Sequence, residues 1–282
     1  MVFDSGSREL PGLSLAIERW ESQFFNFYEL DAQLDALAES QDGPFALALL
    51  GEEEARSRAW RGILTRCQRL LNRRNRASDG ELFDRVLAEH RRAHDLAKPL
   101  VRADYDHALD TWQWVLRLAP EADLALQLAA LFHDVERLIS EADARSEHRA
   151  ADYQAFKDEH AARGAEWAET LLARAGVDAT TRRRAARQIA VHERPPHLED
   201  GAADGESAAV AWLNDADALS FFALNSVGYL DYYGPEQTRK KVAYTLRRLR
   251  PAARRHLAGM RLPPQVREAV AEDLRGFPGQ LT

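Results

Sequence analysis

The chain has 282 residues, a formal net charge of -7 and 45% hydrophobic residues. A chain of this length and composition can bury a sizeable core, so we expect a globular protein of one large or two small domains. Its single cysteine, Cys67, excludes an internal disulfide and a CxxC site, which indicates a reducing compartment. No segment reaches the roughly 20 apolar residues of a membrane span, and the opening MVFDSGSREL lacks the features of a signal peptide. We therefore expect a cytoplasmic protein with no membrane partner.

The basic residues are concentrated in two runs. Residues 56–76 contain eight arginines, residues 239–255 contain eight arginines or lysines, and neither run contains an acidic residue. Two positive patches on an acidic chain favour a phosphate-bearing ligand or a nucleic acid as partner. The alternative is that both runs are solvated helix faces. Trp60 is the only aromatic residue of the first run, which gives base stacking with a nucleic acid little support.

Helical periodicity runs through the chain, and no stretch alternates apolar and polar residues over the length of a strand. We therefore predict an all-α fold. The first clear apolar stripe runs from Trp60 to Leu71. ASDGELF at 77–83 starts a new helix, the prolines and glycines of 194–207 predict a loop, and YYGPEQT at 232–238 predicts a further break. The predicted organisation is an N-terminal helical region of unknown role at 1–95, a helical core at 96–230 and a basic C-terminal helical extension at 231–282.

Three histidines are predicted to lie on helix faces that point into the core. His107 and His160 each share a face with apolar or aromatic residues one to three turns away. His192 closes a helix, because Pro195 prevents that helix from continuing far beyond it. A single buried histidine is more often a hydrogen-bonded core residue than a ligand. Three of them on core-facing stripes need a common explanation.

Acidic residues occur on the same apolar surfaces. The stretch ALFHDVERL places His133 and Asp134 directly after an apolar run, and Asp217 lies on VAWLNDADALSFFAL, a helix that is apolar nearly all round. An isolated buried carboxylate costs several kcal/mol, so a partner, a proton shift or a metal normally neutralises it. A divalent cation resolves these groups together, because neutral imidazoles and ionised carboxylates are its natural ligands. The side chains of adjacent helix residues point about 100° apart. His133 and Asp134 can therefore bind the same ion only if it lies between their two directions; otherwise each binds a different ion.

The order His107, then His133 and Asp134, then Asp217 resembles the HD-domain superfamily of metal-dependent phosphohydrolases, whose pattern is H…HD…D on an all-helical bundle. The resemblance covers roughly residues 100–225. DHALDTWQWV, LAALFHDVERL and NDADALSFF are similar in type to the first, second and last motifs of that family. The resemblance implies an HD-like, metal-binding helical core.

The resemblance also implies a set of ligands for a divalent metal cofactor. His160 and His192 are similar in placement to the two extra histidines of HD proteins that bind two metals, so two ions are expected. Asp215 is the alternative to Asp217. The residue types suit Mn, Mg, Co, Fe or Zn alike. The implied ligands are His107, His133, Asp134, His160, His192 and Asp217.

The implied activity is hydrolysis of a phosphoester, for example in a nucleotide or another small phosphorylated metabolite. A divalent ion lowers the pKa of its water toward about 7 and polarises a phosphoryl oxygen. Basic side chains near the ion can neutralise the phosphate. The predicted catalytic residues are His133, Asp134 and Arg137, and the predicted substrate-binding residues are Arg194, Lys240 and Lys241.

Two other functions stay open. Some HD proteins with the extra histidines hold two irons and oxidise their substrate with oxygen, and this chain resembles them as well. The chain could instead be a non-catalytic helical adaptor or nucleic-acid binder, with a structural metal and with residues 56–76 as the binding surface.

Overall fold

The computed structural model describes residues 80–119, 122–194, 205–260 and 262–275. These residues form helices and connecting turns with no strand, which confirms the predicted all-α class. The helix predicted from Trp60 and the basic run 56–76 lie outside the described residues, as does most of the loop predicted at 194–207.

The chain divides into two compact units: residues 1–74 with 259–261, and residues 75–258 with 262–282. The predicted border at residue 230 falls inside a helix that runs from residue 226 to residue 248. The helix that begins in the predicted core therefore continues into the predicted C-terminal extension.

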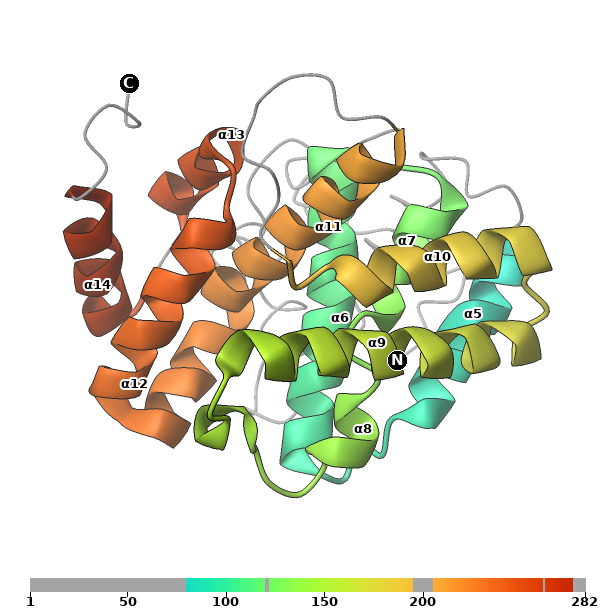
Figure 1. Cartoon of the computed structure of the whole chain (residues 1–282), viewed down its shortest axis with the longest axis horizontal. Helices are drawn as coiled ribbons and strands as arrows, with labels where there is room; N and C mark the ends of the chain where they lie inside the picture. Colours follow the sequence, from blue (N-terminus) through green and yellow to red (C-terminus); the bar gives the residue numbers. More distant parts are fainter. Residues whose placement is uncertain (1–79, 120–121, 195–204, 261, 276–282) are drawn as a thin grey trace, which may run out of the picture. The chain divides into compact units, whose positions relative to one another are not determined.

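The helices of the second unit follow one another in the order drawn in Figure 1. Aspartates begin three of them, because the side chains of Asp123, Asp152 and Asp178 accept hydrogen bonds from backbone N–H groups of the first turn at 2.9 to 3.0 Å. The bounds are α5 Gly80–Ala93, α6 Pro99–Leu118, α7 Leu124–Phe132, α8 Arg137–Ser140, α9 Tyr153–Arg174, α10 Ala179–Val191, α11 Gly205–Ser220, α12 Ser226–Arg248, α13 Pro251–Arg254 and α14 Pro264–Arg275. Three shorter elements are the 3-10 helices η1 Glu147–Arg149 and η3 Arg255–Gly259 and the π-helix η2 Phe221–Asn225.

The core is built around α6 and α7. Helix α6 packs against α7 and α11, and α10 packs against α7, α9 and α11 (Figure 1). Every residue of α7 from Ala125 to Phe132 is buried, and the large rings of Trp112 and Trp114 on α6 are buried with them. A helix that is apolar all round belongs in the interior. The end of α7 therefore delivers the residues that follow it into the core.

Gly164 lets α9 approach the end of α7 closely. A Cβ atom at this position would lie only 3.3 Å from the carbonyl oxygen of His133. The absence of a side chain thus places the preceding turn of α9, which carries His160, directly against the polar residues after α7.

The break predicted at 232–238 falls at Gly234. Its φ of 77° and ψ of 175° lie outside the helical region. Helix α12 therefore consists of two helical segments that meet at a kink at Gly234. Glycine tolerates a positive φ, and Pro235 supplies no backbone N–H, so the two residues together bend the helix. The π-helix η2 directly precedes α12. Residues 226–233 therefore form a short helical segment between two irregularities.

None of the helices in the described part of the chain is both long enough and apolar enough to cross a bilayer.

His94, which follows α5, gives a test of the fold through pH. The residue is 4% exposed, its Nδ1 lies 2.6 Å from the carbonyl oxygen of His90, and burial lowers its pKa to about 4. In the unfolded chain the pKa of a histidine is about 6.5, so His94 is protonated there at a higher pH than in the folded protein. The free energy of unfolding therefore decreases as the pH falls from about 6.5 toward 4. Between pH 7.5 and pH 5, we expect the unfolding free energy of His94→Gln to fall by about 2 kcal/mol less than that of the wild type, as measured by urea denaturation. The exposed His148→Gln is the control, and an identical pH dependence in wild type and His94→Gln would contradict the assignment.

Candidate metal centre

His133 and Asp134 emerge at the end of α7. His133 is the C-terminal cap of that helix, and its Nδ1 lies 2.9 Å from the carbonyl oxygen of Ala130. When Nδ1 donates a hydrogen to this oxygen, Nε2 is left with a lone pair. Both residues are buried, with exposed fractions of 0% and 8%. The local hydrogen bond thus fixes which nitrogen of His133 faces the interior.

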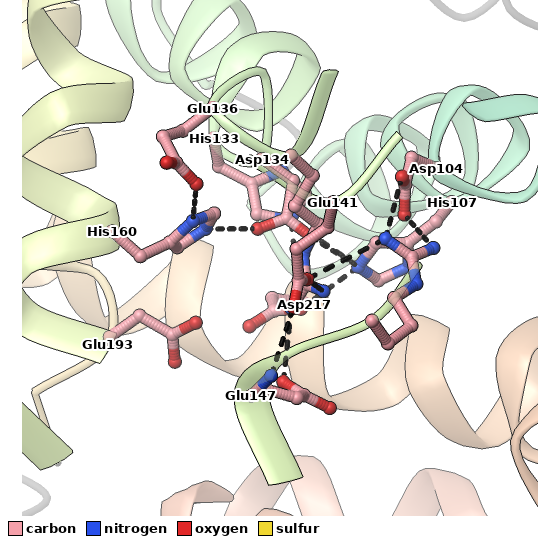
Figure 2. Close-up of polar contacts among 12 residues, drawn as sticks. Asp104, His107, His133, Asp134, Glu136, Glu141, Glu147, His160, Glu193 and Asp217 are labelled. Carbon is pink, nitrogen blue, oxygen red and sulfur yellow. Dashed lines mark hydrogen bonds and ion pairs between the residues drawn. The ribbon is translucent and has the colours of Figure 1, made fainter. Parts of the chain in front are cut away.

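Four potential ligand atoms converge from α6, the end of α7 and α11 (Figure 2). His107 Nε2 lies 3.1 Å from Asp217 Oδ1 and 3.3 Å from His133 Nε2. Asp134 Oδ2 lies 3.9 Å from His107 Nε2 and 3.8 Å from His133 Nε2. Ligands about 2.1 Å from one ion stand roughly 3.0 to 3.4 Å apart in octahedral or tetrahedral geometry. These separations fit a single divalent ion after small shifts of the side chains.

The charges of the cluster favour a cation. Burial opposes ionisation of Asp134 and Asp217, but Arg137 holds the pKa of Asp134, and Arg248 the pKa of Asp217, well below the usual range. Burial also opposes a charge on His133, yet its two aspartate neighbours outweigh burial and raise its pKa to about 9. An ion that binds the imidazole displaces this proton, so binding releases protons and strengthens as the pH rises.

His107 is held from behind by a serine. Its Nδ1 lies 2.8 Å from the hydroxyl of Ser220 at the end of α11. The Ser220 hydroxyl also lies 3.4 Å from the backbone carbonyl oxygen of His107. Second partners of this kind fix the tautomer and the orientation of a metal-binding imidazole. They leave His107 Nε2 directed at the cluster.

His160 and His192 differ in how their nitrogens are used. His160 Nε2 lies 2.9 Å from Asp134 Oδ1, and its Nδ1 lies 2.7 Å from Glu136 Oε2, as Figure 2 shows. Burial lowers the pKa of His160, but these two carboxylates outweigh it and raise the pKa. His160 therefore acts first of all as a hydrogen-bond partner of Asp134.

His192 has one open nitrogen. Its Nδ1 lies 2.7 Å from the carbonyl oxygen of Ile189, whereas its Nε2 is buried and has no hydrogen-bond partner among the residues that the structure describes. Burial lowers its pKa to about 4, so the ring is neutral at pH 7. Ring nitrogens of His192 and His133 and a carboxylate oxygen of Asp217 lie within 4.8 Å of one another. A buried imidazole nitrogen without a partner, beside ionised carboxylates, fits a cation in the cluster.

A cavity of about 320 Å³ opens from the cluster. His107, Asp134 and Asp217 line one part of it, and aromatic rings of η2 and α12 line another. Basic side chains also line it. The aromatic residues are Phe221, Tyr229, Tyr232 and Tyr233, and the basic residues are Arg137, Arg145, Lys157, Lys241 and Arg248.

Of the predicted substrate-binding residues, only Lys241 lines this cavity. Lys240 is its neighbour on α12 and points about 100° away, toward Glu236 at 3.0 Å. Arg194 is exposed and lies 3.9 Å from Asp158. The predicted catalytic residue Arg137 is at the site, where its Nε donates to Asp134 Oδ2 at 3.0 Å.

Asp215, the predicted alternative ligand, points away from the cluster. Its carboxylate accepts hydrogen bonds from Arg250, from the backbone N–H at 2.9 Å and from Nε at 2.7 Å. Asp217 lies two residues further along α11 and therefore faces a different side of the helix. Of the two aspartates, Asp217 is the one beside His107 and His133.

Several buried charged residues at the site were not predicted, among them Glu147, Lys157, Glu193 and Arg248. Lys157 lies one turn before His160 on α9, and Glu193 directly follows His192. These spacings were the signals available in the sequence. Glu147 lies in the short helix η1 and carries no such signal, because its sequence neighbourhood, SEHRA, is typical of a solvated turn.

The fold and the cluster define an all-α protein with a buried histidine and aspartate centre that suits a divalent cation. The chain belongs to the family described as Domain of unknown function (DUF4202), whose model matches residues 80–270. No curated protein and no solved structure matches the chain.

The aspartates of α11 provide a matched pair of variants. We expect Asp217→Asn to weaken Mn²⁺ binding at least about 100-fold in calorimetric titration, because a charged ligand of the cluster is removed. Asp215→Asn should keep the affinity and lose thermal stability, since it leaves Arg250 without its carboxylate. Equal Mn²⁺ affinities in the two variants would contradict the assignment of Asp217.

The support of His107 is tested with two buried serines. Ser220→Ala should lower Mn²⁺ affinity about 10- to 100-fold, because Nδ1 of His107 loses the partner that fixes the ring. The control is Ser226→Ala, whose hydroxyl instead donates to the carbonyl oxygen of Phe222 at 3.0 Å. If the two substitutions changed the affinity equally, Ser220 would have no specific role.

Proposed function

We propose that this protein is a hydrolase, dependent on a divalent metal, that cleaves a phosphoester bond in a small phosphorylated compound. The observation that carries the proposal is the convergence of four ligand atoms from His107, His133, Asp134 and Asp217 at one end of a cavity that also holds buried cations. A bound divalent ion would supply Lewis-acid polarisation of a phosphoryl oxygen and an activated water as nucleophile.

Lys241 is the side chain best placed to bind the phosphate. Its Nζ lies 3.0 Å from the hydroxyl oxygen of Tyr153 and 3.8 Å from the nearest carboxylate oxygen, on Glu147. The other cations of the cavity have closer carboxylate partners: Arg137, Arg145, Lys157 and Arg248. The ammonium group of Lys241 is therefore the least neutralised and can attract an anionic group to the cavity.

The aromatic residues suit the organic part of the substrate. The rings of Tyr229 and Tyr233 lie 4.3 Å apart, and Phe221 lies 5.7 Å from Tyr229. These rings offer flat apolar surface to a bound molecule. A cavity of about 320 Å³ is near the lower limit for ligand sites, which favours a monomeric phosphorylated metabolite over a polymer.

The activity can be tested with a panel of small phosphomonoesters and phosphodiesters. We expect release of inorganic phosphate, or of a phosphomonoester from a diester, in the presence of Mn²⁺, Mg²⁺ or Co²⁺ and loss of turnover after chelation. A protein loaded with metal that turns over none of these compounds would contradict the proposal. Binding of RNA or DNA that weakens with salt, without turnover, would instead favour the adaptor function.

Neighbouring lysines of α12 test how the phosphate is bound. Lys241→Met should lower kcat/KM about 10- to 100-fold, mainly through KM, because one charge-assisted hydrogen bond to the substrate is lost. Lys240→Met should stay within about twofold of wild type, since Lys240 faces Glu236 outside the cavity. Steady-state kinetics with a substrate found in the panel would measure both. Equal losses in the two variants would rule out this role for Lys241.

A further inference from the structure

Lys157 is a buried ammonium group beside the cluster. It lies on α9, its side chain is 3% exposed, and its Nζ forms an ion pair with Glu193 and lies 3.8 Å from Glu147. Burial of a lysine without a carboxylate partner would favour the neutral amine. Here burial lowers the pKa of Lys157, but Glu193, together with Tyr153 and Glu147, outweighs burial and raises it. Lys157 is therefore a fixed positive charge inside the site.

Arg248 is a second fixed charge on the same side of the cluster. Its Nη1 lies 3.1 Å from Glu193 Oε2, and its Nη2 donates to Asp217 Oδ2 at 2.8 Å and to the carbonyl oxygen of His192 at 3.2 Å. The guanidinium group thus bridges Glu193 and Asp217. Together with Lys157 it pairs both oxygens of Glu193 with cations.

The side chains that would hold a second ion are already engaged. Both nitrogens of His160 contact carboxylates, Asp134 at 2.9 Å and Glu136 at 2.7 Å. Glu193 lies beside His192, with Oε1 3.7 Å from the open Nε2, but it is paired with Lys157 and Arg248. A second divalent ion would have to displace these partners.

We infer that the centre binds one divalent ion, held by the cluster of His107, His133, Asp134 and Asp217, and that Lys157 and Arg248 take the place of a second ion. His192 has a ring nitrogen within 4.8 Å of ligand atoms of His133 and Asp217, and it also forms a group with Asp134 and Glu193. Because Glu193 is paired with Lys157 and Arg248, only the first of these groups can receive an ion without breaking an ion pair. The inference rests on the ion binding included in the proposed function, but it does not depend on hydrolysis. It differs from the expectation of two ions that follows from the resemblance to HD proteins with extra histidines.

The number of ions per chain tests the inference directly. Purified protein is stripped with chelator, titrated with Mn²⁺ in a calorimeter, and analysed for metal after removal of free ion. We expect one Mn²⁺ per chain in the wild type. Lys157→Met keeps the length of the side chain and removes its charge, so the freed carboxylate of Glu193 should recruit a second Mn²⁺ together with Asp134 and His192. Lys98→Met, at a half-exposed lysine paired with Asp143, should keep one ion.

For the wild type, two Mn²⁺ ions or two irons per chain, or no bound ion, would overturn the inference. For the Lys157→Met variant, a folded protein that still binds only one ion would overturn it as well. If that variant does not fold, the double variant Lys157→Met with Glu193→Gln removes both charges and should fold with one ion per chain. Two ions in the double variant would also overturn the inference. Failure to hydrolyse any phosphoester, with one ion bound, would reject the proposed function and leave this inference standing.

Discussion

The burial of ionised carboxylates is the constraint on which the rest of this structure depends. Asp134 and Asp217 lie among helices whose other residues are mostly apolar, and a carboxylate in such surroundings is stable only when it is neutralised. The chain supplies a guanidinium to each of them, Arg137 to Asp134 and Arg248 to Asp217, and directs two imidazoles at the space between. Most of the buried polar contacts near the centre follow from this need.

The helices around the centre each contribute one part of the solution. The apolar helix α7 carries His133 and Asp134 into the interior, and α6 and α11 bring His107 and Asp217 to the same point. Helix α9 comes close to the end of α7 because Gly164 has no side chain, and it adds His160 and Lys157. Helix α12 adds Lys241 and Arg248 from beyond its bend at Gly234. A centre assembled from five helices depends on the whole fold, so its geometry is sensitive to packing at a distance.

The basic run at 239–255 illustrates how a sequence feature divides in three dimensions. Lys241 and Arg248 enter the cavity, whereas Arg239 lies 3.5 Å from Glu272 and Lys240 faces Glu236. Arg250 pairs with Asp215, which is buried on a different face of α11 from Asp217. The run is thus neither a uniform surface patch nor a uniform ligand site. Helical geometry alternates its residues between the interior and the surface.

The sequence by itself determined the helical class and the inward direction of His107, His160 and Asp217, because helical periodicity shows which residues share a face with apolar neighbours. It also placed His133 and Asp134 at the end of an apolar run. Tertiary structure decided which faces meet. It separated Asp217 from Asp215 and Lys241 from Lys240, and it brought Glu147, Glu193, Lys157 and Arg248 to the centre. Periodicity gives a direction around one helix axis, but contacts between residues far apart in the chain depend on how helices pack, and a single sequence contains no local signal for that packing.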